Sequence, residues 1–241
     1  MSFTVIIPAR FGSKRLPGKP LLELKGKPLI QMVFEKAISS KAEKVYVASD
    51  HKKVLNCCKE FGALAVDTSP DHLTGTDRIA EVITKLDIEE DSIVVNLQGD
   101  EPFIDPKDIN NVAELLRDNI SFTMGTLFAD LTADEEDNPN IVKIWVDQNK
   151  KVKGFSRNKD YLQTKGLYRA KHMGIYSYRA GFIKKFVNWD QTKNEVSERL
   201  EQLRAFENNI PIGAIEALSK NCIGIDTKED LIKARSMLVD E

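Results

Sequence analysis

Residues 1–20, MSFTVIIPARFGSKRLPGKP, form the stretch around which the rest of the chain is organised. The apolar, β-branched run of residues 3–7 is typical of a buried strand, and Pro8 ends that run. The loop that follows contains Gly12 and Gly18, which let backbone N–H groups approach oxygen atoms closely. Its cations are Arg10, Lys14, Arg15 and Lys19. Because ligands of open α/β sheets bind outside the carboxyl ends of the strands, this loop is a candidate site for phosphates.

The loop matches neither of the two common phosphate-binding patterns. A Walker loop has four residues between its glycines, whereas five stand between Gly12 and Gly18, and Pro20 replaces the metal-binding hydroxyl. The glycine fingerprint of dinucleotide-binding folds is missing as well. By composition alone, a solvated basic loop is therefore an equal alternative to a phosphate site.

Strand and helix patterns alternate through the first half of the chain. The strand patterns fall at residues 3–7, 44–49, 64–66 and 92–97. A helical pattern begins near Pro28, and a second runs to residue 61, with Asp50 as its expected cap. A third enters from the loop that ends at Arg78. This alternation predicts an α/β fold with a parallel sheet and right-handed crossovers.

The second half of the chain breaks that alternation. Residues 141–147 and 152–156 read as a hairpin, so a small antiparallel unit is expected to be inserted into the sheet. One continuous helix is expected over residues 195–208, with Val196 on its apolar side. The last helix begins at Thr227, which forms a capping-box-like pair with Asp230. We expect one domain over residues 1–241, with residues 141–190 as a subregion for insertion and dimerisation.

The composition argues against several classes of protein. Charged residues make up 30% of the chain but leave a net charge of −2, whereas nucleic-acid-binding proteins normally have a strong basic excess. No apolar run is long enough for a membrane span, and residues 3–7 are too short for the core of a signal peptide. The cysteines, Cys57, Cys58 and Cys222, lack metal-binding spacing and are expected to be reduced. We therefore expect a cytoplasmic protein that binds neither nucleic acid nor membrane.

Other polar residues also follow predicted strands or precede predicted helices. Asp100 comes just after the strand at residues 92–97, where a carboxylate is either a natural Mg²⁺ ligand or an ordinary turn residue. Thr74 and Arg78 lie where a helix begins, which suits an anionic ligand or a simple helix cap. Position alone would make Asp226 one more polar residue before the last helix.

Taken in order, the motifs of the chain resemble those of cytidylyltransferases that activate acidic sugars, and of the Kdo (3-deoxy-D-manno-octulosonate) group above all. The matching segments are IPARFGSKRLPGKPL, ASDH, TGTDRIAE, VNLQGDEPFI, NPNIVK, FSR, KHMGIYSYRAGFI, LEQLR and GIDTKEDL. The resemblance implies a Rossmann-like, mostly parallel sheet of the nucleotide-diphospho-sugar transferase type. It also implies Mg²⁺-dependent transfer of CMP from CTP to the anomeric hydroxyl of Kdo, for lipopolysaccharide biosynthesis, by a homodimer.

The resemblance carries roles onto individual residues of the nucleotide side. Arg10, Arg15 and Lys19 would hold the triphosphate, and Ala9 and Arg10 would lie near the cytosine. The remaining polar residues expected around the nucleotide and the sugar next to it are Thr74, Arg78 and Gln98. Asp100 and Asp226 would hold Mg²⁺, and Lys19, Arg15 and Asp100 would be the catalytic residues.

On the sugar side, the resemblance implies a pocket for an acidic eight-carbon sugar. Its residues would be Arg157, His172, Tyr176, Glu201 and Gln202, with Arg157 facing the sugar carboxylate. The segment after Arg157, residues 158–165, is shorter than in the family and lacks its usual Ile-Pro and basic residues. An 8-amino analogue of Kdo or another acidic sugar therefore stays open as the substrate. The other alternative, a nucleotide-binding protein without turnover, is disfavoured because both carboxylates and all the loop cations are present.

Overall fold

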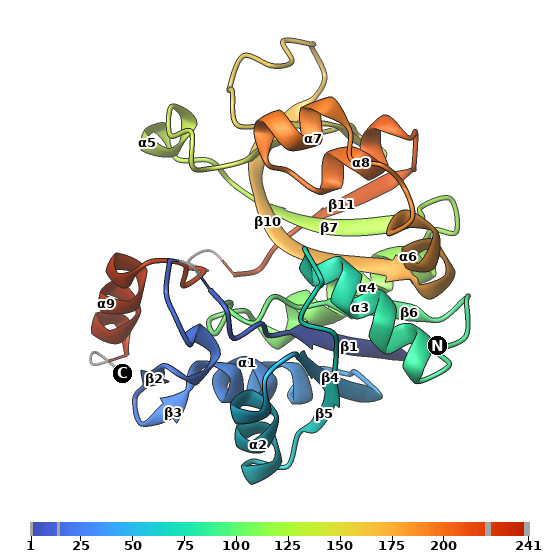
Figure 1. Cartoon of the computed structure of the whole chain (residues 1–241). Helices are drawn as coiled ribbons and strands as arrows, with labels where there is room; N and C mark the ends of the chain where they lie inside the picture. Colours follow the sequence, from blue (N-terminus) through green and yellow to red (C-terminus); the bar gives the residue numbers. More distant parts are fainter. Residues whose placement is uncertain (1, 14, 220–222, 239–241) are drawn as a thin grey trace.

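The computed structural model describes residues 2–13, 15–219 and 223–238. Lys14 and Cys222 thus lie outside the described residues. The described chain forms a nine-stranded mixed sheet, in which seven strands follow the order β11-β7-β10-β6-β1-β4-β5 (Figure 1). In chain order these seven are β1 (Phe3–Pro8), β4 (Lys44–Ser49), β5 (Leu64–Asp67), β6 (Ile93–Asn96), β7 (Met124–Ala129), β10 (Tyr168–Arg179) and β11 (Ile212–Glu216). The predicted α/β fold with a mostly parallel sheet and antiparallel pieces is confirmed.

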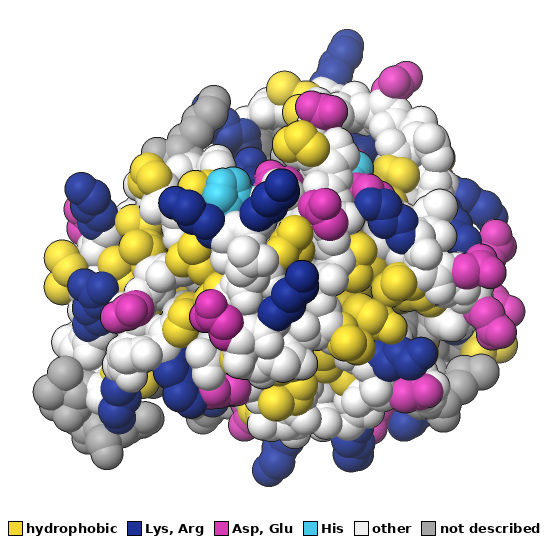
Figure 2. Space-filling model, turned by 60° about the horizontal axis from the view of Figure 1, so that its bottom comes forward, with side chains coloured by type: hydrophobic (Ala, Val, Ile, Leu, Met, Phe, Trp, Pro, Cys, Tyr) yellow, Lys and Arg dark blue, Asp and Glu magenta, His cyan; other side chains and the backbone are white. Residues whose placement is uncertain are grey.

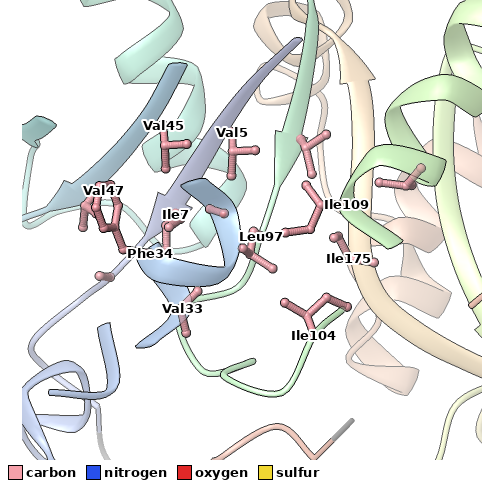
Figure 3. Packing of buried hydrophobic residues seen from close by; sticks show 14 of the residues in the cluster. Val5, Ile7, Val33, Phe34, Val45, Val47, Leu97, Ile104, Ile109 and Ile175 are labelled. Carbon is pink, nitrogen blue, oxygen red and sulfur yellow. The ribbon is translucent and has the colours of Figure 1, made fainter. Parts of the chain in front are cut away.

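Strand β1 lies in the middle of the sheet and serves both of its faces. Its side chains alternate, so Val5 and Ile7 belong to one apolar core and Ile6 to the other. The first core is covered by α1 (Leu29–Ile38), α2 (Lys52–Glu60) and α4 (Pro106–Asp118). Figure 3 shows α1 residues such as Val33 packed against Val5, Val47 and Leu97 of this core. The second is covered by α3 (Gly75–Lys85), α6 (Ala180–Phe186) and α8 (Gln202–Glu207).

The strand order reverses next to β1, and this reversal creates a place for a ligand. From β1 the chain moves outward to β4 and β5, each paired in parallel with its neighbour. It then returns through α3 to β6, which pairs in parallel with the opposite edge of β1. Crevices at such a reversal, outside the carboxyl ends of the strands, are the usual binding sites of open α/β sheets.

Strand β10 supplies the antiparallel part of the sheet. It runs antiparallel to β6 and β7, and its first residues pair with β8 (Lys143–Val146). Strand β9 (Val152–Ser156) completes the predicted hairpin by pairing with β8. The pairing of β10 with β7 shifts register between Met173 and Tyr176, which is a bulge in the middle of the strand.

The predicted helix over residues 195–208 is wrong as one continuous element. The structure has α7 (Lys193–Glu198), a left-handed residue at Arg199 with φ 54°, and then α8. A bidentate ion pair between Glu195 and Arg204, 2.5 Å at its shortest, explains the break. Nine residues of continuous helix would separate these two by about 13 Å, so the pair requires a turn between them. Val196, expected on the apolar side, is 58% exposed.

Two helix caps were also predicted. Thr227 and Asp230 form the expected capping box at the start of α9 (Lys228–Met237). The cap of α2 is His51 rather than Asp50, because the His51 ring accepts the N–H of Lys53 and Asp50 is engaged elsewhere. The short elements that remain are η1 (Lys19–Leu21), β2 (Glu23–Leu24), β3 (Lys27–Pro28) and α5 (Ala133–Glu136).

The surface and the helices agree with the composition. Figure 2 shows acidic and basic side chains interspersed over one face of the molecule, without a field of a single sign on that face. Among the described helices, none combines the length and apolar character needed to cross a bilayer. Cys57 and Cys58 are free thiols, and burial raises the pKa of Cys58 to about 12.

Candidate functional site

A cavity of about 630 Å³ opens at the strand reversal beside β1. It is lined by all nine residues that the sequence assigned to nucleotide or metal, namely Ala9, Arg10, Arg15, Lys19, Thr74, Arg78, Gln98, Asp100 and Asp226. They come from the loops after β1 and β6, from the start of α3 and from the residue before the cap of α9. The structure therefore brings together residues that lie far apart in the sequence.

The backbone of the cavity depends on a close approach between two loops. The loop after β1 stays bound to β4, because the N–H of Ala9 donates to the carbonyl of Ala48 at 2.8 Å. The turn after β6 packs so closely against it that a Cβ atom at Gly99 would lie 2.9 Å from the carbonyl oxygen of Pro8. Only glycine fits there without a shift of backbone, so Gly99 lets Gln98 and Asp100 face the first loop.

Lys19 is the centre of charge in the cavity. Its Nζ lies 2.5 Å from Oδ2 of Asp100 and 2.9 Å from Oδ1 of Asp226. Burial alone would lower the pKa of Lys19, but Asp100 and Asp226 together raise it above its ordinary value. The two carboxylates thus share one cation and converge on one point.

A second cation completes this arrangement. Arg15 donates from Nη2 to Oδ2 of Asp226 at 2.9 Å. Burial works to raise the pKa of Asp226, but Lys19 and Arg15 hold it below its usual range. In Figure 1 the loop after β1 accordingly reaches the start of α9.

Glu101 is a third carboxyl in the same place, and sequence reasoning missed it. Its Oε2 is buried without a hydrogen-bond partner among the described atoms. Burial, helped by the charges of Asp100 and Asp226, raises the pKa of Glu101 to about 8. Two convergent carboxylates with an unsatisfied carboxyl oxygen behind them are hard oxygen donors of the kind that suits Mg²⁺. Within residues 2–13, 15–219 and 223–238, no group of three or more His, Cys, Asp or Glu is arranged to hold a metal ion.

His172 and Tyr176 lie on the two sides of the bulge in β10. Their ring centres are 5.4 Å apart, and His172 Nε2 is 3.0 Å from the hydroxyl of Thr126. Burial lowers the pKa of His172 to about 3, so the ring is neutral at physiological pH. Burial also raises the pKa of the Tyr176 phenol, which therefore keeps its proton. A bulge is a usual way to re-aim strand side chains toward a site.

Glu201 connects this region to the nucleotide cavity. One of its carboxyl oxygens accepts the hydroxyl of Thr76 at 2.7 Å, directly after Thr74 and Gly75 of the cavity wall. The other oxygen is buried and has no partner among the described atoms. Burial raises the pKa of Glu201. Gln202, the next residue, is buried at the start of α8.

Arg157 lies among main-chain carbonyls rather than in the cavity. Its Nε donates to the carbonyl of Glu198 at 2.9 Å, and its Nη1 donates to the carbonyls of Pro139 and Asn140 at 3.1 Å each. The backbone N–H of Arg157 also donates to the Glu198 side chain. The structure thus does not group Arg157 with the nine cavity residues.

Other cavity residues had no role assigned from sequence. They are Pro8, Gly12, Ser13, Pro20, His72, Leu73, Gly75 and Gly99. His72 and Leu73 belong to the turn-rich loop before α3, where Glu81 accepts from the N–H of Ser69 at 2.8 Å. The residue types of that loop suited either an anionic ligand or an ordinary helix cap, and the structure places His72 and Leu73 in a wall of the cavity.

Comparison with known proteins gives a consistent result. The profile of the family described as Cytidylyltransferase matches residues 4–216. A 3-deoxy-manno-octulosonate cytidylyltransferase of Haemophilus influenzae is 46% identical over 252 residues, which cover 99% of each chain. A protein of the same name from Pseudomonas syringae pv. syringae is 45% identical, over 98% of each chain.

Solved structures show the same architecture. A structure of CMP:2-keto-3-deoxy-manno-octonic acid synthetase complexed with CTP superposes with a TM-score of 0.92 at 37% identity, over 100% of this chain and 99% of the other. A cytidylyltransferase from Leptospira borgpetersenii shares the fold, with a TM-score of 0.68 at 18% identity.

Proposed function

The chain belongs to the cytidylyltransferase family, and from this premise we propose that it transfers CMP from CTP to the anomeric hydroxyl of Kdo. The products are CMP-Kdo, for lipopolysaccharide biosynthesis, and pyrophosphate. The observation that carries the proposal is the convergence of Lys19, Asp100 and Asp226 in a cavity that the cations of the first loop also line. The similarity to relatives that carry the Kdo name covers almost the whole chain, which supports Kdo as the acceptor.

The reaction needs positioned charge and no covalent enzyme intermediate. The anomeric hydroxyl oxygen attacks the α-phosphorus of CTP, the bond from that phosphorus to the β-phosphate oxygen breaks, pyrophosphate leaves, and the hydroxyl proton is released to water. Negative charge builds on the leaving group, so cations beside it lower the barrier. We assign Arg10, Arg15 and Lys19 to the triphosphate, Ala9 and Arg10 to the cytosine, and Thr74, Arg78 and Gln98 to the nucleotide and the neighbouring sugar.

Asp100 and Asp226 would hold Mg²⁺, with Glu101 behind them. When bound, the ion would supply positive charge that neutralises the phosphates. Lys19 binds both of these carboxylates and Arg15 binds Asp226, so CTP would draw the two cations toward its phosphates and leave the carboxylates to the metal. These ion pairs balance the negative charge of Asp100 and Asp226 within the cavity.

The acceptor would bind between β10 and α8. His172, Tyr176, Glu201 and Gln202 would contact its hydroxyl groups, and a neutral His172 can do so only by hydrogen bonding. Arg157 would pair with the sugar carboxylate, which requires its guanidinium to leave some of the carbonyls it now binds. We further propose a homodimer that forms through residues 141–190 and acts in the cytoplasm as a single domain.

A difference in length from the relatives bears on the identity of the sugar. The alignment with the Haemophilus relative spans 252 residues, whereas this chain has 241, so the relative carries residues that this chain lacks. A shortened segment at residues 158–165 would alter the far end of the sugar pocket. An 8-amino analogue of Kdo is therefore the second candidate acceptor.

One assay tests the function and the choice of sugar together. Purified protein, CTP and Mg²⁺ are incubated with Kdo, with its 8-amino analogue or with other acidic sugars, and pyrophosphate release is measured. We expect release with Kdo and formation of CMP-Kdo by mass spectrometry. Faster turnover of the 8-amino analogue would identify that sugar as the preferred acceptor. Binding of CTP without pyrophosphate release on any acceptor would indicate a nucleotide-binding protein without turnover.

A further inference from the structure

The segment ASDH, residues 48–51, matched the family without receiving a role. Asp50 directly follows β4, between the loops that follow β1 and β5. From this central place it reaches the nucleotide loop on one side and a buried arginine of the cavity on the other. We propose that Asp50 and His51 act as a clamp that positions the triphosphate-binding loop; this inference rests on the proposed function.

The first arm of the clamp holds the backbone of the loop. Oδ1 of Asp50 accepts the N–H of Phe11 at 3.2 Å. Phe11 stands between Arg10 and Gly12, and both of these residues line the cavity. The hydrogen bond therefore acts on the part of the loop from which the cations project.

The second arm of the clamp is the buried ion pair between Asp50 and Arg78. Oδ2 of Asp50 lies 3.2 Å from Nη2 of Arg78, whose side chain is 3% exposed and whose Nη1 also binds the hydroxyl of Thr68. A buried guanidinium needs a partner charge, so Asp50 keeps Arg78 in place in the cavity wall. One carboxylate thereby ties the loop after β1 to the first turns of α3.

His51 holds the same loop residue by its side chain. The rings of His51 and Phe11 are stacked, with centres 3.9 Å apart and planes 12° apart. Two consecutive residues after β4 thus fix both the backbone and the ring of Phe11. His51 has a separate task as well, because its ring accepts the N–H of Lys53 and so caps α2.

The backbone of Phe11 joins the two ends of the loop by hydrogen bonds. Its carbonyl oxygen accepts the N–H of Ser13 at 2.9 Å and the N–H of Gly18 at 3.3 Å. Gly18 has a φ of 68°, which favours glycine, and it directly precedes Lys19. Holding Phe11 in place therefore holds both ends of the loop that carries Arg15 and Lys19.

If Asp50 positions the loop, removal of its charge should weaken the binding of CTP but not that of the sugar. In Asp50→Asn the amide oxygen can still accept from Phe11, but the charge that faces Arg78 is gone. Displacement of reacting groups by about 1 Å can cost about 100-fold, so we expect the Kd and KM for CTP to rise by about 10- to 100-fold. The KM for the sugar should stay within about twofold, since the bonds of the Asp50 side chain go to Phe11 and Arg78 and not to the proposed acceptor residues of β10 and α8.

The experiment measures CTP binding by calorimetry without sugar, steady-state kinetics and amide hydrogen exchange of residues 10–13. Asp67→Asn is the matched control, because Asp67 ends the neighbouring strand β5 and its side chain is exposed. Selective loss of CTP affinity and faster exchange at Phe11 in Asp50→Asn alone support the clamp. Unchanged CTP binding, or equal losses for CTP, sugar and Tm, overturns it.

Two His51 variants test the clamp even if Asp50→Asn does not fold. His51→Phe keeps the stacked ring and loses the helix cap, whereas His51→Asn keeps a capping side chain and loses the ring. The clamp requires weaker CTP binding in His51→Asn and little change in His51→Phe, and the reverse order overturns it. If the unaltered protein binds no CTP, the proposed function fails, while the exchange rate at Phe11 still reports on the clamp itself.

Discussion

The nucleotide side and the sugar side of the molecule are built in different ways. On the proposed nucleotide side, the candidate residues stand on loops that directly follow β1 and β6 or begin α3 and α9, and the parallel part of the sheet brings these loops to one edge. On the sugar side, the candidate residues stand on a bulged antiparallel strand and at a break between two short helices. Figure 1 shows α7, α8 and β10 gathered in one half of the molecule and α1, α2 and β4 in the other.

The two sides also differ in charge. Arg15, Lys19, Asp100 and Asp226 form a chain of ion pairs in an open cavity. His172 and Tyr176 are neutral because burial shifts their pKa values, and Glu201 has a raised pKa for the same reason. The charges of the first region agree with its proposed role in binding polyphosphate and metal, and the neutral groups of the second agree with its proposed role in binding hydroxyl groups.

The largest expected effect belongs to Asp100→Asn. This change keeps the shape of the side chain but removes a charge from the point where two carboxylates converge. We expect kcat to fall by several orders of magnitude, while the Tm and the sugar side are preserved. Steady-state rates with Mg²⁺ and circular dichroism provide the measurement. Near-normal turnover with Mg²⁺ would remove Asp100 from the metal site.

Glu195→Gln should instead destabilise the region of α7 and α8 on the proposed sugar side and leave CTP binding unchanged. It leaves Arg204 buried without its partner charge, and such losses cost about 3–5 kcal/mol of folding stability. Thermal melting and CTP calorimetry measure the two sides separately. We expect a lower Tm and impaired sugar use, with CTP affinity retained. The control is Glu207→Gln on α8, where the glutamate is exposed and pairs with Asn194.

Lys19→Met tests whether the nucleotide side neutralises itself. CTP use should fall by about 100-fold because a cation beside the phosphates is lost. Removal of the ammonium also frees Asp100 and leaves Asp226 paired with Arg15 alone, so Mn²⁺ without nucleotide should bind about tenfold more tightly, or by roughly 1.4 kcal/mol.

Titration of Mn²⁺ by water-proton relaxation measures that second effect. Lys27→Met is the control, since Lys27 is an exposed lysine paired with Glu35 outside the cavity. CMP binding should change far less than CTP use. Equal losses for CTP and CMP, or weaker Mn²⁺ binding, would place Lys19 elsewhere in the mechanism.

Arg157→Lys should raise the KM for the sugar by about tenfold and leave CTP affinity nearly unchanged. Lysine keeps the charge but loses the planar fork that pairs with a carboxylate. It also cannot reproduce the bonds that Arg157 makes to three main-chain carbonyls. Kinetics with CTP and sugar varied in turn check this. A variant that loses CTP affinity and keeps sugar use would assign the residue to the other ligand.

The smallest effect is a pH dependence of stability from His172. Its folded pKa, about 3, lies below its ordinary value of 6.5, so between these values the unfolded state binds more protons. Its contribution to stability is therefore complete above about pH 6.5 and is lost as the pH falls toward 3. Melting curves from pH 7 to pH 4 should show a shallower slope in His172→Gln than in the unaltered protein, and equal slopes would contradict the buried neutral ring.

Local patterns in the sequence predicted much of the fold. Short apolar, β-branched runs predicted strands such as β1, and the Thr227–Asp230 pair predicted the start of α9, because both features depend on neighbours only a few residues away. The same patterns failed for residues 195–208, where helical periodicity continued through the turn at Arg199. The contact that forces this turn joins side chains nine residues apart, and periodicity does not register such a contact.

The sequence by itself determined which residues carry charge and that they follow strands or precede helices. Motif order made Lys19, Asp100 and Asp226 candidates, although Asp100 and Asp226 stand 81 and 207 positions after Lys19 in the chain. Only the pairing of β1 with β4 on one side and β6 on the other decided that their loops meet, that Glu101 lies behind them and that Asp50 reaches both Phe11 and Arg78. Strand order depends on the free energy gained when apolar side chains from the whole chain are buried on both faces of the sheet. A local stretch of sequence therefore does not determine it.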